Sequence, residues 1–233
     1  MDGERKLLPS MMNCHDIKML IEEGEGFRLE FKRRISSAEK IARTIISFAN
    51  TKGGIILFGV DDDGSIIGVE SEKSEVALIE VAGHDFIDPP IQTVIEIVPF
   101  DGKDVIVCHI PESTSKPHYF LGPIDRTDGD NTRVYIRVND KTMMASKEVV
   151  NILRDENPES PPLKVMIGEN EKRLFQYLDQ NERITVRGFG RLVNVSDRRA
   201  SRMLVRLVRA GAIRIHTHEK EEYFTLAYDV DHS

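Results

Sequence analysis

The residues best placed to do chemistry form an acidic group and a basic group. The acidic group is Glu25, Glu30 and Asp61, which stand near the ends of two segments expected to be strands. Carboxylates that converge at strand ends can hold Mg²⁺ or Mn²⁺, and such a metal can clamp a phosphodiester and activate water. On one straight strand Glu25 and Glu30 would face opposite sides, but the glycines beside Glu25 could bend the chain.

The same carboxylates also have a structural interpretation, which spacing alone favours. Glu30 lies between Arg28 and Lys32 on a polar strand face, where it could simply pair across strands. Asp61 to Asp63, followed by a glycine, is typical of a tight turn. No histidine or cysteine in this half has metal-site spacing, and Cys108 is expected to be a buried small hydrophobe.

The basic group lies in the last third of the chain. From Arg183 to Arg214 there are nine arginines and one acid, Asp197. A merely solvated helix would normally intersperse glutamate with lysine, whereas arginine without lysine suits bidentate contact to phosphate or to guanine edges. We expect major-groove contacts from Arg198, Arg199 and Arg202, and contacts to the DNA backbone from Arg187, Arg191 and Arg206. The structural alternative is a protein-contact module whose arginines pair with the acidic first half.

The elements that position these arginines follow one another in a defined order. Apolar spacing predicts a helix over 170–181, a short strand, a helix over 187–194 and a helix that begins after Ser196 and ends before Gly211. Two strands then flank HEKEE as a hairpin. This order resembles a winged helix-turn-helix. Three wing glutamates would repel phosphate, so the helix must carry the contact: Glu219, Glu221 and Glu222.

The first half mixes helices and strands without regular alternation, which predicts an α+β class. Strands are expected around 27–31, 55–60 and 132–138, with a hairpin at Asp101-Gly102. Helices are expected from a capping box at Ser36 and Glu39 to Asn50, over 72–86 and over 146–154. There is no phosphate-binding loop and no dinucleotide-binding glycine pattern.

Length and charge indicate two domains. Residues 154–163 contain three prolines and no periodicity, so we predict domains at 1–153 and 164–233 joined by a linker. The 19 basic and 29 acidic residues before Lys164 give −10, and the 13 basic and 10 acidic residues from Lys164 onward give +3. No apolar run could cross a bilayer and the first residues are no signal peptide, so a cytoplasmic location is expected.

Three segments carry a shared pattern: LEFKRR (29–34), SFANTKGGIILFGVDDDGSIIGV (47–69) and VYIRVNDKTMMAS (134–146). Together they resemble the AlbA-like domain of the Schlafen superfamily. The resemblance covers roughly residues 20–150 and departs from the family pattern at Asn139-Asp140. It implies a mixed α/β domain linked to nucleic-acid binding, and family members carry transcriptional-regulator or ATP-binding labels.

The resemblance also bears on the carboxylates. Schlafens that cut transfer RNA use two glutamates five residues apart and a downstream aspartate, a pattern that Glu25, Glu30 and Asp61 match. The Schlafen zinc site has no counterpart here, and a homodimer would have to supply a second lobe. The leading hypothesis is a non-enzymatic, DNA-binding transcriptional regulator. The alternatives are a Mg²⁺- or Mn²⁺-dependent ribonuclease acting on RNA and, third, a nucleotide-sensing module.

Overall fold

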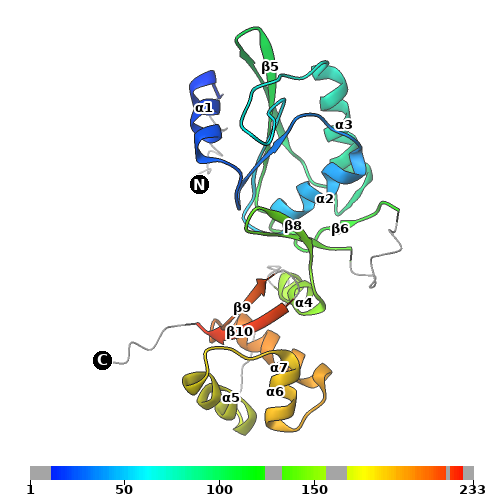
Figure 1. Ribbon diagram of the computed structural model, residues 1–233. Coiled ribbons are helices and arrows are strands. Elements are labelled where there is room, and N and C mark those ends of the chain that lie inside the picture. The colour runs from blue at the N-terminus through cyan, green and yellow to red at the C-terminus, as the bar shows by residue number, and fades with distance from the viewer. Residues whose placement is uncertain (1–11, 124–132, 156–166, 219–220, 228–233) are drawn as a thin grey trace, which may run out of the picture. The chain divides into compact units, whose positions relative to one another are not determined.

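The computed structural model in Figure 1 describes residues 12–123, 133–155, 167–218 and 221–227. The chain divides into two units, Met1–Ser113 with His118–Met144 and Thr114–Pro117 with Ala145–Ser233. Helix α4 (Lys147–Asp155), expected to close the first domain, belongs to the second unit. The first two residues of the predicted linker, Arg154 and Asp155, end this helix, and residues 156–163 lie outside the described residues.

A four-stranded sheet forms the centre of the first unit. Its order is β1 (Leu29–Lys32), β2 (Gly54–Phe58), β5 (Lys103–Ile110) and β4 (Val94–Phe100). β1 runs parallel to β2, whereas β2–β5 and β4–β5 pair antiparallel. The predicted turn at Asp101-Gly102 joins β4 to β5, and both residues have the positive φ of a tight hairpin turn. The predicted apolar strand β2 is therefore internal to the sheet.

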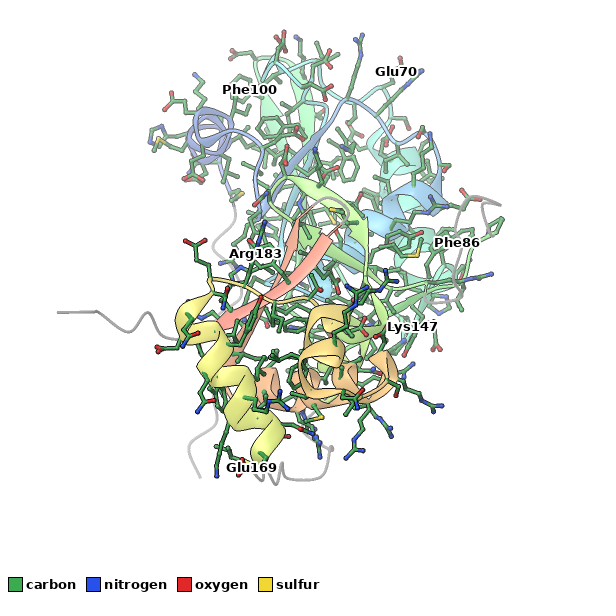
Figure 2. All side chains as sticks on the ribbon, turned by 60° about the horizontal axis from the view of Figure 1, so that its bottom comes forward. Glu70, Phe86, Phe100, Lys147, Glu169 and Arg183 are labelled. Atoms are coloured by element: carbon green, nitrogen blue, oxygen red, sulfur yellow. The ribbon has the colours of Figure 1, made fainter. Side chains whose placement is uncertain are left out.

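Both faces of this sheet are covered. Ile56 and Phe58 point into a core shared with α2 (Ala38–Ala49) and α3 (Glu72–Asp85), whereas Leu57 points to the opposite face. There it packs in a cluster with Ile17 of α1 (Cys14–Glu23). Alternate residues of one strand thus supply two cores, as the pleat requires. Figure 1 shows α1 on one side of the sheet and α2 and α3 on the other, and Figure 2 shows the side chains between them.

Two local predictions for this unit need correction. Helix α2 is capped by Ser37, whose side chain accepts the Lys40 amide, and not by Ser36. The strand expected around 27–31 begins at Leu29, and its polar residue Glu30 is buried instead of solvated. Short ribbons complete the unit: β3 (Ile87–Asp88) with β6 (Tyr119–Phe120), and β7 (Tyr135–Val138) with β8 (Lys141–Met144).

The second unit follows the predicted order of elements. After α4 come α5 (Glu169–Gln180), α6 (Val186–Val193), α7 (Asp197–Arg209), and the antiparallel pair β9 (Ile213–His218) and β10 (Glu221–Leu226). The short strand expected before α6 is a single bridge between Ile184 and Phe224. Gly211 follows the α7 cap with a φ of 69°, the left-handed conformation that ends the helix. In the described residues no helix is long and apolar enough to span a bilayer.

Candidate nucleic-acid interface

Helix α7 presents arginines because its apolar residues are taken up by the core. Ala200, Met203, Leu204 and Leu207 are buried in the core of the second unit, at the three- and four-residue spacing of one helix face. The arginines on the remaining faces are exposed: Arg198, Arg199, Arg202 and Arg206. None of these four forms an ion pair with a carboxylate of a described residue.

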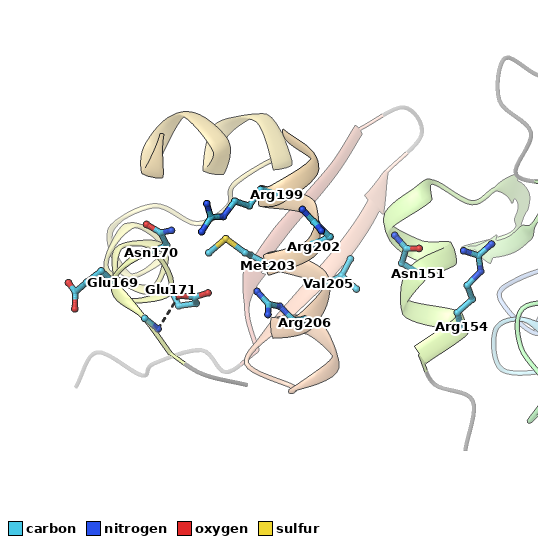
Figure 3. Close-up of a pocket in the computed structure, with 11 residues that line it drawn as sticks. Asn151, Arg154, Glu169, Asn170, Glu171, Arg199, Arg202, Met203, Val205 and Arg206 are labelled. Atoms are coloured by element: carbon cyan, nitrogen blue, oxygen red, sulfur yellow. Dashed lines mark hydrogen bonds between the residues drawn. The ribbon is translucent and has the colours of Figure 1, made fainter. Parts of the chain in front are cut away.

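Three of these arginines share one groove. Arg199, Arg202 and Arg206 recur at spacings of three and four, so they form one stripe along α7. The stripe lines a groove of about 730 Å³ between α7, the start of α5, and α4 (Figure 3). Arg198 does not line this groove. Of the three arginines predicted to contact the DNA major groove, only Arg199 and Arg202 therefore lie on the same surface of the protein.

The groove also contains a fourth arginine that the sequence analysis missed. Arg154 of α4 lines it together with Asn151, one turn earlier on the same helix. Sequence reasoning placed Arg154 where the helix expected over 146–154 meets the predicted linker, outside the arginine-rich segment. Its place in the groove depends on the packing of α4 beside α7, and no local pattern in the sequence predicts that contact.

Two glutamates in the groove wall are already engaged. Glu171 is buried, and its Oε2 accepts the amide of Gly168 at 3.0 Å in a helix-capping bond. Glu169 accepts from Lys172 Nζ at 2.8 Å. Both carboxylates therefore have local partners, and the four arginines dominate the charge of the groove.

Helix α4 covers the neighbouring flank of α7. Ser201 and Val205 are 9% and 4% exposed, and Ser201 Oγ donates to Glu148 Oε1 of α4 at 2.6 Å. Figure 3 shows Val205 pointing toward α4. Part of the outer surface of α7 is thus packed against protein, and the arginine stripe lies beside this contact.

Helix α6 supplies the remaining predicted arginines. Thr185 caps it by accepting the Gly188 amide at 3.1 Å. Arg187 and Arg191 are exposed and four residues apart, so they lie on the same side of the helix. Neither lines the groove, which leaves them on a separate exposed surface of the same unit.

The hairpin contributes a partly buried carboxyl group. Burial raises the pKa of Glu222 above its ordinary value, and the nearby charge of Glu148 raises it further, against hydrogen bonds from Ser146 and Thr217 that lower it. His216 stacks on Tyr223 with ring centroids 5.0 Å apart, which gives it a packing role. Glu219, the first of the predicted wing glutamates, lies outside the described residues.

In the first unit the predicted carboxylates have separate partners. Glu25 Oε1 accepts the amide of Phe31 at 2.7 Å, and Asp61 pairs with Arg33 at 3.2 Å. Glu30 pairs with Arg137 and, at 2.5 Å, with Lys32. Among the described residues no three His, Cys, Asp or Glu side chains are arranged to hold a metal ion. The metal-binding role of these carboxylates stays a prediction.

The motif residues that prompted the Schlafen resemblance form a network between α2 and β7. Asn50 donates to the carbonyl oxygens of His118 and Tyr135 and accepts the His118 amide. Thr51 Oγ1 accepts the Arg137 amide at 3.0 Å. The Arg137 guanidinium is buried, donates to Gly26 O at 2.9 Å, and also pairs with Glu30 as described above. These residues fix the packing of the first unit and need no ligand to explain them.

Cys108 behaves as predicted. It is fully buried on β5, and burial raises the pKa of its thiol to about 12. Such a thiol is protonated at neutral pH and unsuited to nucleophilic chemistry.

Comparison with solved structures gives two distant likenesses. The N-terminal domain of an ATP-dependent DNA helicase RecG-related protein from Nitrosomonas europaea is 23% identical, with a TM-score of 0.41 over 56% of this chain and 95% of that one. The DIP2311 protein from Corynebacterium diphtheriae is 15% identical, with a TM-score of 0.46 over 84% of this chain and 36% of that one. No curated protein matches the chain.

The family comparison is more decisive, because its match covers over half of the chain. Residues 25–146 match the model described as Schlafen, AlbA_2. This stretch contains all three motif segments, from the strand with Glu30 to the ribbon with Arg137. The chain belongs to the Schlafen, AlbA_2 family.

Proposed function

We propose that this protein is a DNA-binding transcriptional regulator whose second unit acts as a winged helix-turn-helix. The observation that carries the proposal is the set of exposed arginines on α6 and α7, which have no carboxylate partner among the described residues. Helix α7 follows the turn after α6, the place of a recognition helix in this motif. Arginine suits both phosphate and guanine, so the same helix surface can serve affinity and sequence readout.

Family membership supports a nucleic-acid-related role without specifying the nucleic acid. The arginine surface lies outside the family match, in a part of the chain with its own core. DNA recognition is therefore proposed for the second unit, and a homo-oligomer is the expected state, since operators commonly mirror protein symmetry.

The experiment is a salt titration of duplex DNA binding by the full chain. Replacing Arg199 and Arg202 by alanine should weaken duplex binding at least about tenfold and flatten its salt dependence, because two positive charges are removed from the DNA-facing helix. The matched control is Arg173→Ala, which removes an exposed arginine of α5 outside the groove and should leave both quantities unchanged. An unaltered affinity and slope in the double variant would refute this placement of DNA.

The alternative is a Mg²⁺- or Mn²⁺-dependent ribonuclease that uses Glu25, Glu30 and Asp61. The ion pairs of Glu30 favour a structural role for that residue, but a metal assay decides the question. Transfer RNA incubated with the protein and Mn²⁺ should stay intact under the regulator proposal. Cleavage that disappears in Glu25→Ala would establish the ribonuclease instead.

A further inference from the structure

The central sheet of the first unit ends in a strand whose outer side has no neighbouring strand. β4 stands last in the order β1-β2-β5-β4, so β5 is its only strand partner among the described residues. The two-residue turn makes Phe100 and Lys103 the first hydrogen-bonded pair of the hairpin. Pairing then alternates, so Ile95 and Ile97 direct their main-chain N–H and C=O groups away from β5. Neither amide donates to another main-chain group among the described residues.

Two observations support this assignment of the outward edge. Asp104, the residue after Lys103, gives its carbonyl oxygen to the Val69 amide at 2.9 Å instead of to β4, as the alternation requires. Pro99 falls on the outward side with the two isoleucines, where its missing N–H leaves no ladder bond unmade. The proline also closes this end of the edge to further pairing, so the free template runs over residues 93–97.

An apolar groove of about 890 Å³ lies beside this free edge. Helix α3 lines it with Val76 and Ile79, and β4 lines it with Ile95 and Ile97. Ile79 is buried, whereas Ile97 is 47% exposed, an unusual exposure for a large apolar side chain in a sheet. The groove therefore offers room for apolar side chains directly beside main-chain groups that lack a partner strand.

The groove is preformed at the end where the chain enters β4. The Ile91 amide donates to the Gly83 carbonyl oxygen at 3.1 Å, and a Cβ atom at Gly83 would lie 2.7 Å from the Ile91 carbonyl oxygen. Helix α3 thus approaches the chain before β4 as closely as a glycine allows. Thr93 is hydrogen-bonded to the buried thiol of Cys108 on β5. Both walls are fixed by the first unit itself, so a ligand has little ordering of the protein to offset.

We propose that this groove docks an extended segment of a partner protein, which joins the four-stranded sheet as a further strand beside β4. Strand addition takes its affinity from main-chain hydrogen bonds and its specificity from pockets for alternate side chains. Ile95 and Ile97 supply the main-chain groups, and the α3 wall supplies the pocket. Every second residue of the segment points into the groove and is apolar. The proposal concerns the first unit and does not rest on DNA binding by the second.

The charge around the groove specifies the residues between those apolar positions. Glu80 lies exposed on the α3 wall, and it forms no ion pair with a described residue. Two other ionisable side chains line the groove: Glu96, whose Oε2 accepts the Met12 amide at 2.7 Å, and His84, which is hydrogen-bonded to Asp85. The groove therefore favours arginine or lysine beside Glu80. A second copy of this chain would instead bring the same carboxylates to the interface.

The first test selects peptides from a random displayed library on the full chain and measures the affinity of the recovered peptides, made synthetically, by fluorescence anisotropy. They should alternate apolar with basic residues. Ile97→Glu should bind them at least about tenfold more weakly, because it places a charge in the apolar groove. Ile67→Glu, at an exposed isoleucine of the same unit outside the groove, is the matched control and should bind as wild type does. Recovery of no peptide, or of peptides indifferent to Ile97→Glu, would overturn the docking groove.

Methylation of the peptide amides separates strand addition from simple burial of an apolar side chain. Methyl groups on the alternate amides that would donate to Ile95 and Ile97 should abolish binding. Methyl groups on the intervening amides, which point away from β4, should be tolerated. Equal effects in the two series would mean that the peptide is not added to the sheet.

Glu80→Lys tests the chemistry assigned to the partner. The reversal should weaken binding of the basic peptides about fivefold and strengthen binding of the same peptides with glutamate in place of arginine and lysine. Unchanged thermal unfolding verifies that the variant is folded, as expected for an exposed helix position. An unchanged preference for basic peptides would overturn the role of Glu80 and the basic partner with it.

Two further outcomes would assign the groove to another occupant. Sedimentation of the full chain tests for a second copy, because a dimer that Ile97→Glu dissociates and Ile67→Glu does not would replace the partner by this chain itself. Peptide binding that requires removal of residues 1–11, which lie outside the described residues, would assign the groove to a segment of the same chain. Either result would overturn the proposed partner, whereas a monomeric full chain that binds basic peptides through Ile97 supports it.

Discussion

Arg137 carries a full positive charge into the interior of the first unit, where only 3% of its surface remains exposed. Its guanidinium donates to Glu30 and to the carbonyl oxygen of Gly26, and it lies over the Phe48 ring at 4.7 Å. Every polar partner of this group is thus supplied by the protein. Removing the guanidinium would leave a carboxylate and a carbonyl oxygen buried with fewer partners.

We therefore predict that Arg137→Met lowers the free energy of unfolding by about 3 kcal/mol, the usual cost of leaving one member of a buried ion pair. Urea denaturation measures this loss. Arg28→Met, at an exposed arginine before β1, is the matched control and should change stability by less than about 0.5 kcal/mol. A loss in Arg137→Met no larger than in the control would mean that the network is not structural.

The same pair shows what single-residue reasoning could not reach. Glu30 alternates with Arg28 and Lys32, so the sequence predicts a solvated strand face, whereas the structure buries it against Arg137, 107 residues away. No local pattern encodes a partner at that separation. Cys108, by contrast, was predicted correctly as buried, because an apolar strand around it is a local signal.

At the scale of elements, periodicity predicted most helices and hairpins, and packing between elements accounts for the misses. Helix α4 was expected close to its observed bounds, but as part of the first domain, whereas it belongs to the second unit. Its sequence pattern predicts an apolar face but does not show which elements cover that face. Arg154 was missed for the same reason. The α7 arginines could be predicted because a local enrichment in one residue type can be recognised from the sequence without knowing the fold.

The contact of α4 with the hairpin should depend on pH through Glu222. The pKa of this carboxyl group is raised in the folded state, so folding favours its protonated form. The protonated carboxyl group therefore contributes to the stability of the folded state below the ordinary glutamate pKa of about 4.5. This contribution is lost as pH rises through the raised pKa of Glu222 in the folded protein. Above that value the buried charge carries a constant penalty.

Glu222→Gln removes this penalty. The melting temperature of the variant should match wild type at acidic pH, below the ordinary glutamate pKa, and exceed it increasingly toward neutral pH. Thermal unfolding followed across this pH range measures the difference. Glu182→Gln, at an exposed glutamate of the same unit, controls for the change in net charge. A difference that is constant with pH would contradict the role assigned to Glu222.

At the scale of the whole molecule, charge is divided unevenly along the chain. The sequence has a net charge of −7, yet the part from Lys164 onward is positive. The net negative charge of the chain would repel DNA at long range. DNA binding must therefore come from a local positive surface that acts within about one Debye length, roughly 10 Å at moderate salt. The first unit also has exposed arginines, at Arg33 and Arg34, which makes the location testable.

Two charge reversals of equal size locate the surface. Replacing Arg187 and Arg191 by glutamate, and separately Arg33 and Arg34 by glutamate, changes the net charge by the same amount in each variant. We expect the α6 pair to lose about a hundredfold in duplex affinity at low salt and the first-unit pair less than about threefold, because only the former contacts phosphate. The ion pair of Arg33 with Asp61 is exposed, so its loss should have little effect on stability. Equal losses of affinity in both variants would show that duplex binding depends on the overall charge of the chain or on both units. This result would contradict the placement of the recognition surface on the second unit.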